Sequence, residues 1–165
     1  MPDYLKKNFF INLLIIIIIF SLDRISKFYI ILKSETNLSS SLYTSKFLNI
    51  NLIWNEGIAF GLFSFNKNYL YNLLTILIVI VIFIILIMII KSEGFKRYAL
   101  SMIFGGALGN LYDRIFYSAV PDFIDFHIKD FHWFIFNVAD IFITIGVIIM
   151  ILSEFRGNEL KNEAL

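Results

Sequence analysis

The alternation of apolar and polar stretches along the 165-residue chain predicts a membrane protein. Four apolar runs lie at residues 9–32, 69–90, 98–117 and 133–152. Each run is close to the length of about 20 residues that a transmembrane helix needs. Polar connections at residues 33–68 and 118–132 separate them on one side of the expected membrane. We therefore expect residues 1–165 to form a single membrane domain, an all-α bundle of four transmembrane helices.

Two shorter patterns lie in the polar connections. Residues 48–55 alternate Leu, Ile, Leu and Trp mostly with Asn, and residues 124–129 alternate apolar with charged side chains. Alternation with a period of two residues is typical of β-strands. Between them, Asn55–Phe63 holds Gly57 and Gly61 among apolar residues and is too short to span a membrane, which favours an interfacial turn or short surface helix. The expected fold adds a small extracytoplasmic β cradle and a short interfacial helix to the four-helix bundle.

Composition strengthens the membrane assignment and removes several kinds of chemistry. Hydrophobic residues make up 59% of the chain, against about 45–50% in soluble domains. The net charge of +1 gives no broad basic surface for nucleic acid. The absence of cysteine excludes disulfides, thiolate metal sites and a cysteine nucleophile. With only two histidines and no H-E-x-x-H motif, we expect no zinc protease site, and the G-x-S-x-G motif of a serine nucleophile does not occur either.

The basic residues predict the orientation in the membrane. Four cations are spread over the two long connections, whereas seven lie near the termini and the short turn between the second and third runs: Lys6, Lys7, Lys91, Lys96, Arg97, Arg156 and Lys161. The positive-inside rule then places both termini in the cytoplasm. In that orientation the polar clusters of different runs share one depth, near the outer leaflet.

Those polar clusters are the candidate site, because ionisable groups in apolar spans are costly unless they are paired or used. Asp23 and Lys27 are four residues apart and can pair on one helix face. A second face holds Asn110 with Asp113 and Arg114, and a third holds Asn137 with Asp140. Asn55 precedes the second run, and Asp122 is expected in the loop between the third and fourth. A structural ion pair capping the bundle is the alternative interpretation of Asp23 and Lys27.

The residue types favour carboxylate chemistry. Two aspartates that share a proton can activate a water molecule and protonate a leaving amine. Asp23 has Lys27 nearby, Asp113 adjoins Arg114, and such partners favour a charged structural carboxylate. Glu56 is expected in the surface turn, and Asp125 and Asp130 in the outer loop near Lys129 and water. Asp122 and Asp140, which lack an adjacent basic residue, remain as the candidate pair. A small proton- or ion-coupled carrier and a structural protein with a buried polar network stay open as alternatives.

Five segments in order along the four runs are similar to the lipoprotein signal peptidase (signal peptidase II) family. They are Asp23–Lys27 (DRISK), Asn55–Gly61 (NEGIAFG), Gly105–Arg114 (GGALGNLYDR), Val120–Phe123 (VPDF) and Phe136–Asp140 (FNVAD). Each motif alone is weak, whereas the ordered set is specific and covers nearly the whole chain. The chain departs from the family at Arg24-Ile25-Ser26, where a Gln and a Thr are more usual.

The resemblance implies an aspartic endopeptidase of the bacterial cytoplasmic (inner) membrane. It would remove signal peptides from diacylglyceryl-modified prolipoproteins, cutting before the lipidated cysteine, without a metal or cofactor. Its catalytic residues would be Asp122 and Asp140. The other implied site positions are substrate-binding Asn55, Gly57, Asn110, Arg114 and Asn137, and supporting Asp23, Lys27 and Asp113. The expected partners are the lipid-modified substrate and membrane lipid, and the protein is expected to be a monomer.

Overall fold

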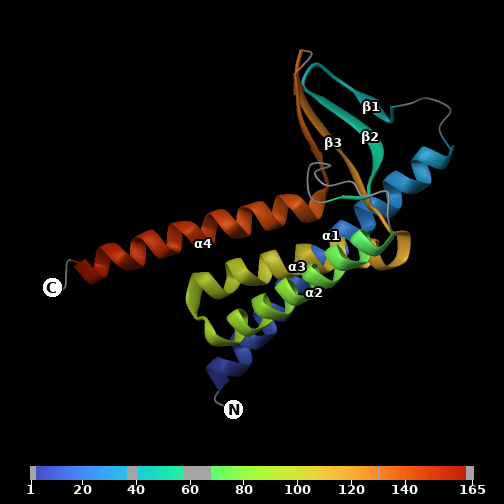
Figure 1. Cartoon of the computed structure of the whole chain (residues 1–165). Coiled ribbons are helices and arrows are strands. Elements are labelled where there is room, and N and C mark those ends of the chain that lie inside the picture. Colours follow the sequence, from blue (N-terminus) through green and yellow to red (C-terminus); the bar gives the residue numbers. More distant parts are fainter. Residues whose placement is uncertain (1–2, 37–40, 58–67, 130, 163–165) are drawn as a thin grey trace.

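The computed structural model describes residues 3–36, 41–57, 68–129 and 131–162. Long helices form a bundle, and a small sheet projects from the end of the bundle away from both chain termini (Figure 1). The elements in chain order are α1 (Asp3–Thr36), β1 (Tyr43–Thr44), β2 (Leu48–Asn55), α2 (Asn68–Lys91), α3 (Gly94–Tyr117), β3 (Val120–Ile128), β4 (Phe131–Phe136) and α4 (Val138–Asn162).

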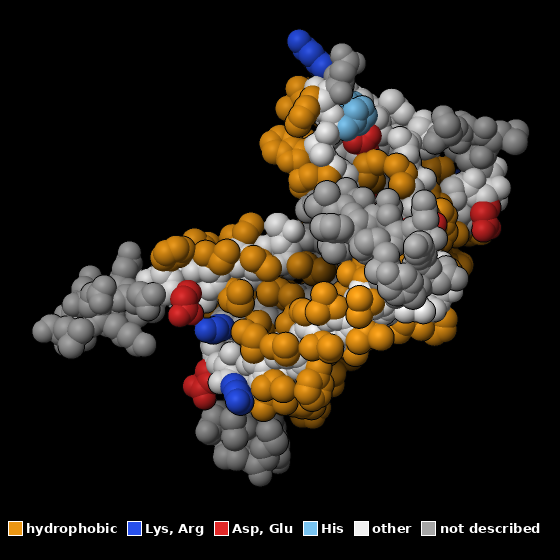
Figure 2. Space-filling model, in the orientation of Figure 1, with side chains coloured by type: hydrophobic (Ala, Val, Ile, Leu, Met, Phe, Trp, Pro, Cys, Tyr) orange, Lys and Arg blue, Asp and Glu red, His pale blue; other side chains and the backbone are white. Residues whose placement is uncertain are grey.

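Among the described residues, three helices are long and apolar enough to cross a membrane, in the segments Phe9–Thr36, Tyr71–Lys91 and Val138–Phe155. Their large apolar side chains are mostly exposed, and they cover the helical surface in Figure 2. A soluble protein would bury such surface, whereas a lipid-facing one need not. The helices predicted at residues 9–32 and 69–90 are confirmed as helices; α2 extends one residue beyond its predicted run at each end, whereas α1 begins six residues earlier and ends four residues later.

α3 is the central helix of the bundle and contacts α1, α2 and α4. Two glycines allow this close packing. A Cβ at Gly109 would lie 2.5 Å from Oδ2 of Asp23 on α1, and one at Gly106 would lie 2.7 Å from the Ala139 carbonyl oxygen on α4. Small residues at such positions let helix backbones approach closely in membranes. These glycines therefore form a small-residue face on α3 against which α1 and α4 pack.

The sheet has four antiparallel strands in the order β1-β2-β3-β4. The strand predicted at residues 48–55 is β2, and the alternation at 124–129 is part of the longer strand β3. Register shifts interrupt the pairing of β2 with β3 and of β3 with β4. Such bulges bend a strand and re-aim its side chains. Most of the short interfacial helix considered for Asn55–Phe63 falls outside the described residues.

The start of the fourth helix was predicted wrongly. Residues 133–136 belong to strand β4, and α4 begins only at Val138. The aromatic and β-branched sequence Phe131–Phe136 suits a strand, and it pairs with β3. Asn137 then ends the strand and caps the helix, with its side-chain oxygen 3.1 Å from the Asp140 amide nitrogen. The connection between α3 and α4 is consequently longer than 118–132, and it is mostly sheet.

Candidate active site

Asp122 and Asp140 meet where the sheet joins the bundle. Asp122 lies in β3, not in a loop as predicted, and is 3% exposed. Asp140 lies in the first turn of α4. Both line a cavity of about 30 Å³, whose other lining residues are Asn55, Asn110, Arg114, Val120 and Asn137. A volume of roughly 10–15 Å³ already suffices for one water molecule, so water has room beside both carboxyl groups.

Asn137 ties the two aspartates together. Its side-chain nitrogen donates to Oδ1 of Asp122 at 2.6 Å, and its backbone nitrogen donates to Oδ2 of Asp140 at 3.2 Å. With the bond from the Asp140 amide to the Asn137 side chain, this is a reciprocal capping box at the start of α4. The same helix start therefore fixes both carboxyl groups.

The electrostatics of Asp122 suit a group that exchanges protons. Burial raises the pKa of Asp122 to about 6, and the nearby Asp140 charge acts in the same direction. Hydrogen bonds from the side chains of Asn55, at 2.9 Å, and Asn137 oppose the rise because they stabilise the carboxylate. A carboxyl group with a pKa near 6 can both hold and release a proton near neutral pH.

Behind the pair, α1 and α3 share a buried ion network. Lys27 bridges Asp23, at 2.9 Å, and Asp113, at 2.6 Å. Arg24 reaches the same two carboxylates, each at 2.6 Å. Asp23, Lys27 and Asp113 are essentially inaccessible, so two formal negative charges are matched by two positive ones away from solvent. Buried charges in proteins are normally paired in this way.

The ion network contacts the candidate pair at two points. Lys27 Nζ donates to the Asn110 side-chain oxygen at 2.8 Å, and the Asn110 nitrogen donates to Oδ1 of Asp140 at 2.8 Å. The backbone nitrogen of Ala139 donates to Oδ1 of Asp23 at 3.1 Å. The first turn of α4 is thus held against α1 and α3.

Arg114 points into the site without a carboxylate partner. It is 8% exposed and lines the small cavity. Its guanidinium donates to the carbonyl oxygens of Gly57, at 3.1 Å, and Asn110, at 3.3 Å. Within the described part of the chain it forms no salt bridge, and its Nε has no hydrogen-bond partner. It therefore retains a donor and a positive charge for a ligand.

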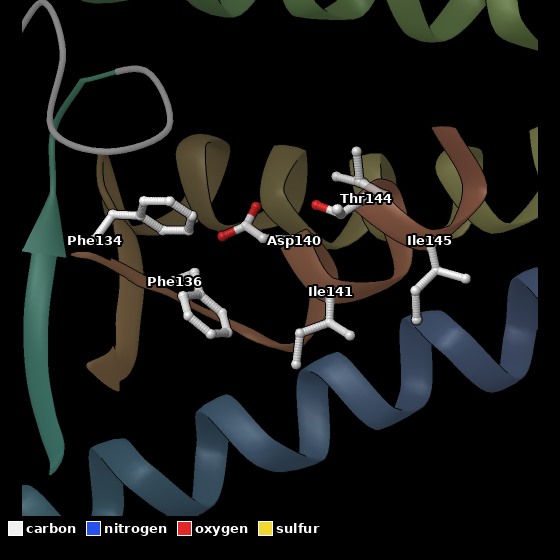
Figure 3. A pocket seen from close by; sticks show the side chains of 7 residues that line it. Phe134, Phe136, Asp140, Ile141, Thr144 and Ile145 are labelled. Carbon is white, nitrogen blue, oxygen red and sulfur yellow. The ribbon is translucent and has the colours of Figure 1, made fainter. Parts of the chain in front are cut away.

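An apolar pocket of about 540 Å³ opens beside Asp140. Phe134 and Phe136 of β4 lie on one side, Ile141, Thr144 and Ile145 of α4 on the other, and the Asp140 carboxylate lies between them (Figure 3). This pocket meets the polar cavity at Asp140, which lines both. A long apolar ligand could therefore lie next to the polar, charged cavity.

The structure brings together all the sequence-predicted positions but changes several partners. Asp113 pairs with Arg24 and Lys27, not with its neighbour Arg114. Asp125 is a buried residue of β3, which contradicts its predicted place in a watery loop. Glu56 is exposed as expected, and Asp130 falls outside the described residues.

Arg24 was not singled out from the sequence as a supporting residue. The signal for Arg24 was the charge balance of the cluster. Asp23 and Asp113 are two acids and Lys27 is one cation, so a second cation was needed.

Comparisons with known proteins identify the family to which the chain is similar. A family model described as Signal peptidase (SPase) II matches residues 15–156. The chain is 54% identical to a lipoprotein signal peptidase of Pelagibacter ubique, over 95% of each chain. It is 40% identical to one of Anaplasma phagocytophilum, over 92% of this chain and 96% of that one. A solved bacterial membrane enzyme matches with a TM-score of 0.73 and 31% identity, over 91% of this chain and 90% of that one.

Proposed function

The chain belongs to the signal peptidase II family, and on that premise we propose that Asp122 and Asp140 make it an aspartic endopeptidase. It is a bacterial membrane protein that processes lipoprotein precursors. The observation that supports the aspartic mechanism best is the shared cavity of about 30 Å³, which both carboxyl groups line. The relatives are peptidases, and none of them supports the alternative of an ion-coupled carrier.

The proposed reaction uses one proton shared by the pair. The ionised carboxylate removes a proton from a water molecule in the cavity, and the resulting hydroxide bonds to the carbonyl carbon of the scissile peptide. The other carboxyl group donates its proton to the leaving nitrogen as the carbon–nitrogen bond breaks. Two carboxyl groups in contact with one water titrate as a unit, so the proton belongs to the pair.

Arg114 is proposed to bind the substrate backbone, and the asparagines beside it to position the two aspartates for the bound substrate. Arg114 lines the cavity, and its Nε has no hydrogen-bond partner among the described residues, whereas the asparagine donors of the cavity already bind the aspartates. A guanidinium is well suited to a peptide carbonyl or to a developing oxyanion. Asn55 and Asn137 donate to Asp122, and Asn110 donates to Asp140. These amides would therefore keep the carboxyl oxygens oriented while substrate binds. Gly57 contributes its carbonyl oxygen to the positioning of Arg114.

The apolar pocket beside Asp140 is proposed to hold the apolar part of the substrate. Its lining of phenylalanine and isoleucine suits a signal-peptide helix or the acyl chains of a diacylglyceryl group. Because the pocket adjoins Asp140, an occupant would place the junction between lipid and peptide near the pair. The specificity for lipid-modified precursors would follow from this adjacency.

The proposed topology is one domain of four spans with both termini in the cytoplasm. α3 is not among the candidate spans identified by length and composition, and it carries Lys96, Arg97, Asp113 and Arg114. We propose that it spans nonetheless, because it lies against all three candidate helices and its ions are paired or lie near its ends. The sheet would then cover the site as an extracytoplasmic cradle. The working unit is proposed to be a monomer.

We propose that hydrolysis needs no metal and no cofactor. Within the described residues, the cavity offers carboxyl, amide and guanidinium groups but no imidazole. The test of function is to incubate purified protein with a diacylglyceryl-modified prolipoprotein, with and without a strong chelator. Release of the signal peptide in both, and none from the unmodified precursor, is expected. Equal cleavage of the unmodified precursor would contradict the proposed role of the lipid.

A further inference from the structure

A second cluster of ionisable groups lies in the sheet and belongs to none of the contacts described above. Asp125 and His127 of β3 and His132 of β4 each offer one ligand atom, and these atoms lie within 4.8 Å of one another. His127 and His132 are opposite each other in the β3–β4 register, and their rings stack with centroids 5.1 Å apart. Both histidines of the chain are therefore in one place, and pale blue histidine surface shows beside acidic surface on the sheet in Figure 2.

The electrostatics of this cluster leave room for a cation. Asp125 is 3% exposed, and its only basic partner among the described residues is His132, whose Nδ1 lies 2.9 Å from both carboxylate oxygens. The remaining contact is a 3.3 Å hydrogen bond from the Asn49 side chain. A carboxylate buried to this extent is normally neutralised by a cation or a metal ion.

His127 supplies an independent indication of a ligand. It is 9% exposed, and its Nδ1 is buried with no hydrogen-bond partner among the residues that the structure describes. Leaving a buried polar atom unsatisfied costs about 1–3 kcal/mol, so such atoms are uncommon in native structures. A metal ion bound to the ring nitrogen would satisfy it.

We propose that Asp125, His127 and His132 bind a divalent transition-metal ion of the zinc class. Two imidazoles and a carboxylate suit Zn²⁺, Ni²⁺ or Cu²⁺ and not the hard ions Mg²⁺ and Ca²⁺. Bond lengths of about 2.0–2.1 Å in a tetrahedral site place ligand atoms roughly 3.3 Å apart. The ligand atoms now lie within 4.8 Å of one another, so the widest separation must close by up to about 1.5 Å, while the 2.9 Å separation between His132 and Asp125 lengthens slightly. His132, whose side chain is 53% exposed, has room to move.

The ion would serve as a structural link between β3 and β4. β3 also carries Asp122, and β4 leads directly into Asn137, so the link would stiffen the two strands that enter the cavity. The metal site shares no residue with the lining of that cavity. Binding is therefore independent of the peptidase assignment and can be tested without substrate.

The test is zinc binding to the full-length protein, without a histidine tag, in detergent. Because the chain has no cysteine and only two histidines, few other sites compete. We expect one Zn²⁺ per chain, measured by competition with a chromophoric chelator, and no comparable binding of Mg²⁺. His132→Asn and His127→Asn should each weaken zinc binding at least about 10-fold, since even loss of outer-shell support costs 10–100-fold. Lys129→Gln, at an exposed position of the same hairpin, is the matched control and should bind as the unmodified chain does.

Thermal unfolding gives a second measurement. Zinc at 100 times its dissociation constant should raise the Tm of the unmodified chain and of Lys129→Gln by roughly 5–10 °C, and that of His132→Asn much less. His132 is half exposed, so its variant remains informative if His127→Asn fails to fold. Absence of saturable zinc binding by the unmodified chain, or undiminished binding by His132→Asn, would overturn the proposal.

Discussion

Replacing Lys27 by methionine should destabilise the fold more than any surface charge deletion. Lys27 is 1% exposed and neutralises Asp23 and Asp113 jointly with Arg24. Methionine has a similar length, so the change removes the charge and little volume. It leaves two buried carboxylates with one cation, and breaking a buried ion pair in this way costs about 3–5 kcal/mol. With roughly 2–4 °C per kcal/mol for a chain of this size, Tm should fall by about 6–20 °C.

The chain provides a matched control for this experiment. Lys96 pairs with Glu154 at 3.0 Å, but the two side chains are 41% and 62% exposed. Lys96→Met should therefore cost less than about 1 kcal/mol, because exposed ion pairs contribute little. A double variant, Lys27→Met with Asp113→Asn, restores the charge balance and should recover part of the lost stability. The assay is thermal unfolding in detergent; equal Tm values for Lys27→Met and Lys96→Met would refute the reasoning.

Three further predictions concern substrate binding, pH and topology. Arg114→Ala should weaken binding of a substrate-like peptide inhibitor by at least 10-fold with little change in Tm, measured by titration and unfolding; unchanged affinity would remove Arg114 from the site. Activity should fall as pH rises through the pKa of Asp122, which burial raises to about 6, because no proton is then left to donate to the leaving nitrogen. Asn55→Ala removes a donor to the Asp122 carboxylate, so this falling limb should move to higher pH, and a shift to lower pH would count against the assignment. Cysteine at Lys46 should react with an impermeant thiol reagent in intact cells, whereas cysteine at Glu93 should react only after permeabilisation; the reverse pattern would invert the topology.

Much of the fold was readable from the sequence because the signals are local. The helices follow from apolar length, and β2 follows from the period-two alternation at residues 48–55. β4 was missed because Phe131–Phe136 is an apolar, aromatic segment interrupted only by His132, and periodicity cannot assign so short a run to strand or helix. The capping residue Asn137 was visible, but the apolar residues before it made the helix seem to start earlier.

The sequence predicted which residues belong to the candidate site but not which of them contact one another. Asn137 and Asp140 are close in sequence, and their reciprocal bonds follow from that spacing. Arg24 and Asp113 are 89 residues apart, and their contact exists only because Gly109 lets α3 approach Asp23. Asp125 was predicted wrongly. Its charged neighbours in the sequence suggested a solvent-exposed loop, whereas strand pairing buries it. Contacts of this kind depend on helix packing and strand register, which local sequence does not encode.

The central claim is that Asp122 and Asp140 act as one catalytic unit, and the most direct test is the cleavage rate of their asparagine variants. Asp122→Asn, Asp140→Asn and the double variant should each release signal peptide from a lipidated prolipoprotein at least about 10³-fold more slowly than the unmodified enzyme. The double variant should be no slower than either single one, because residues that act together do not contribute additively. Glu154→Gln, the same chemical change at an exposed ion pair, should cleave normally. Cleavage by Asp122→Asn at a near-normal rate would contradict the account.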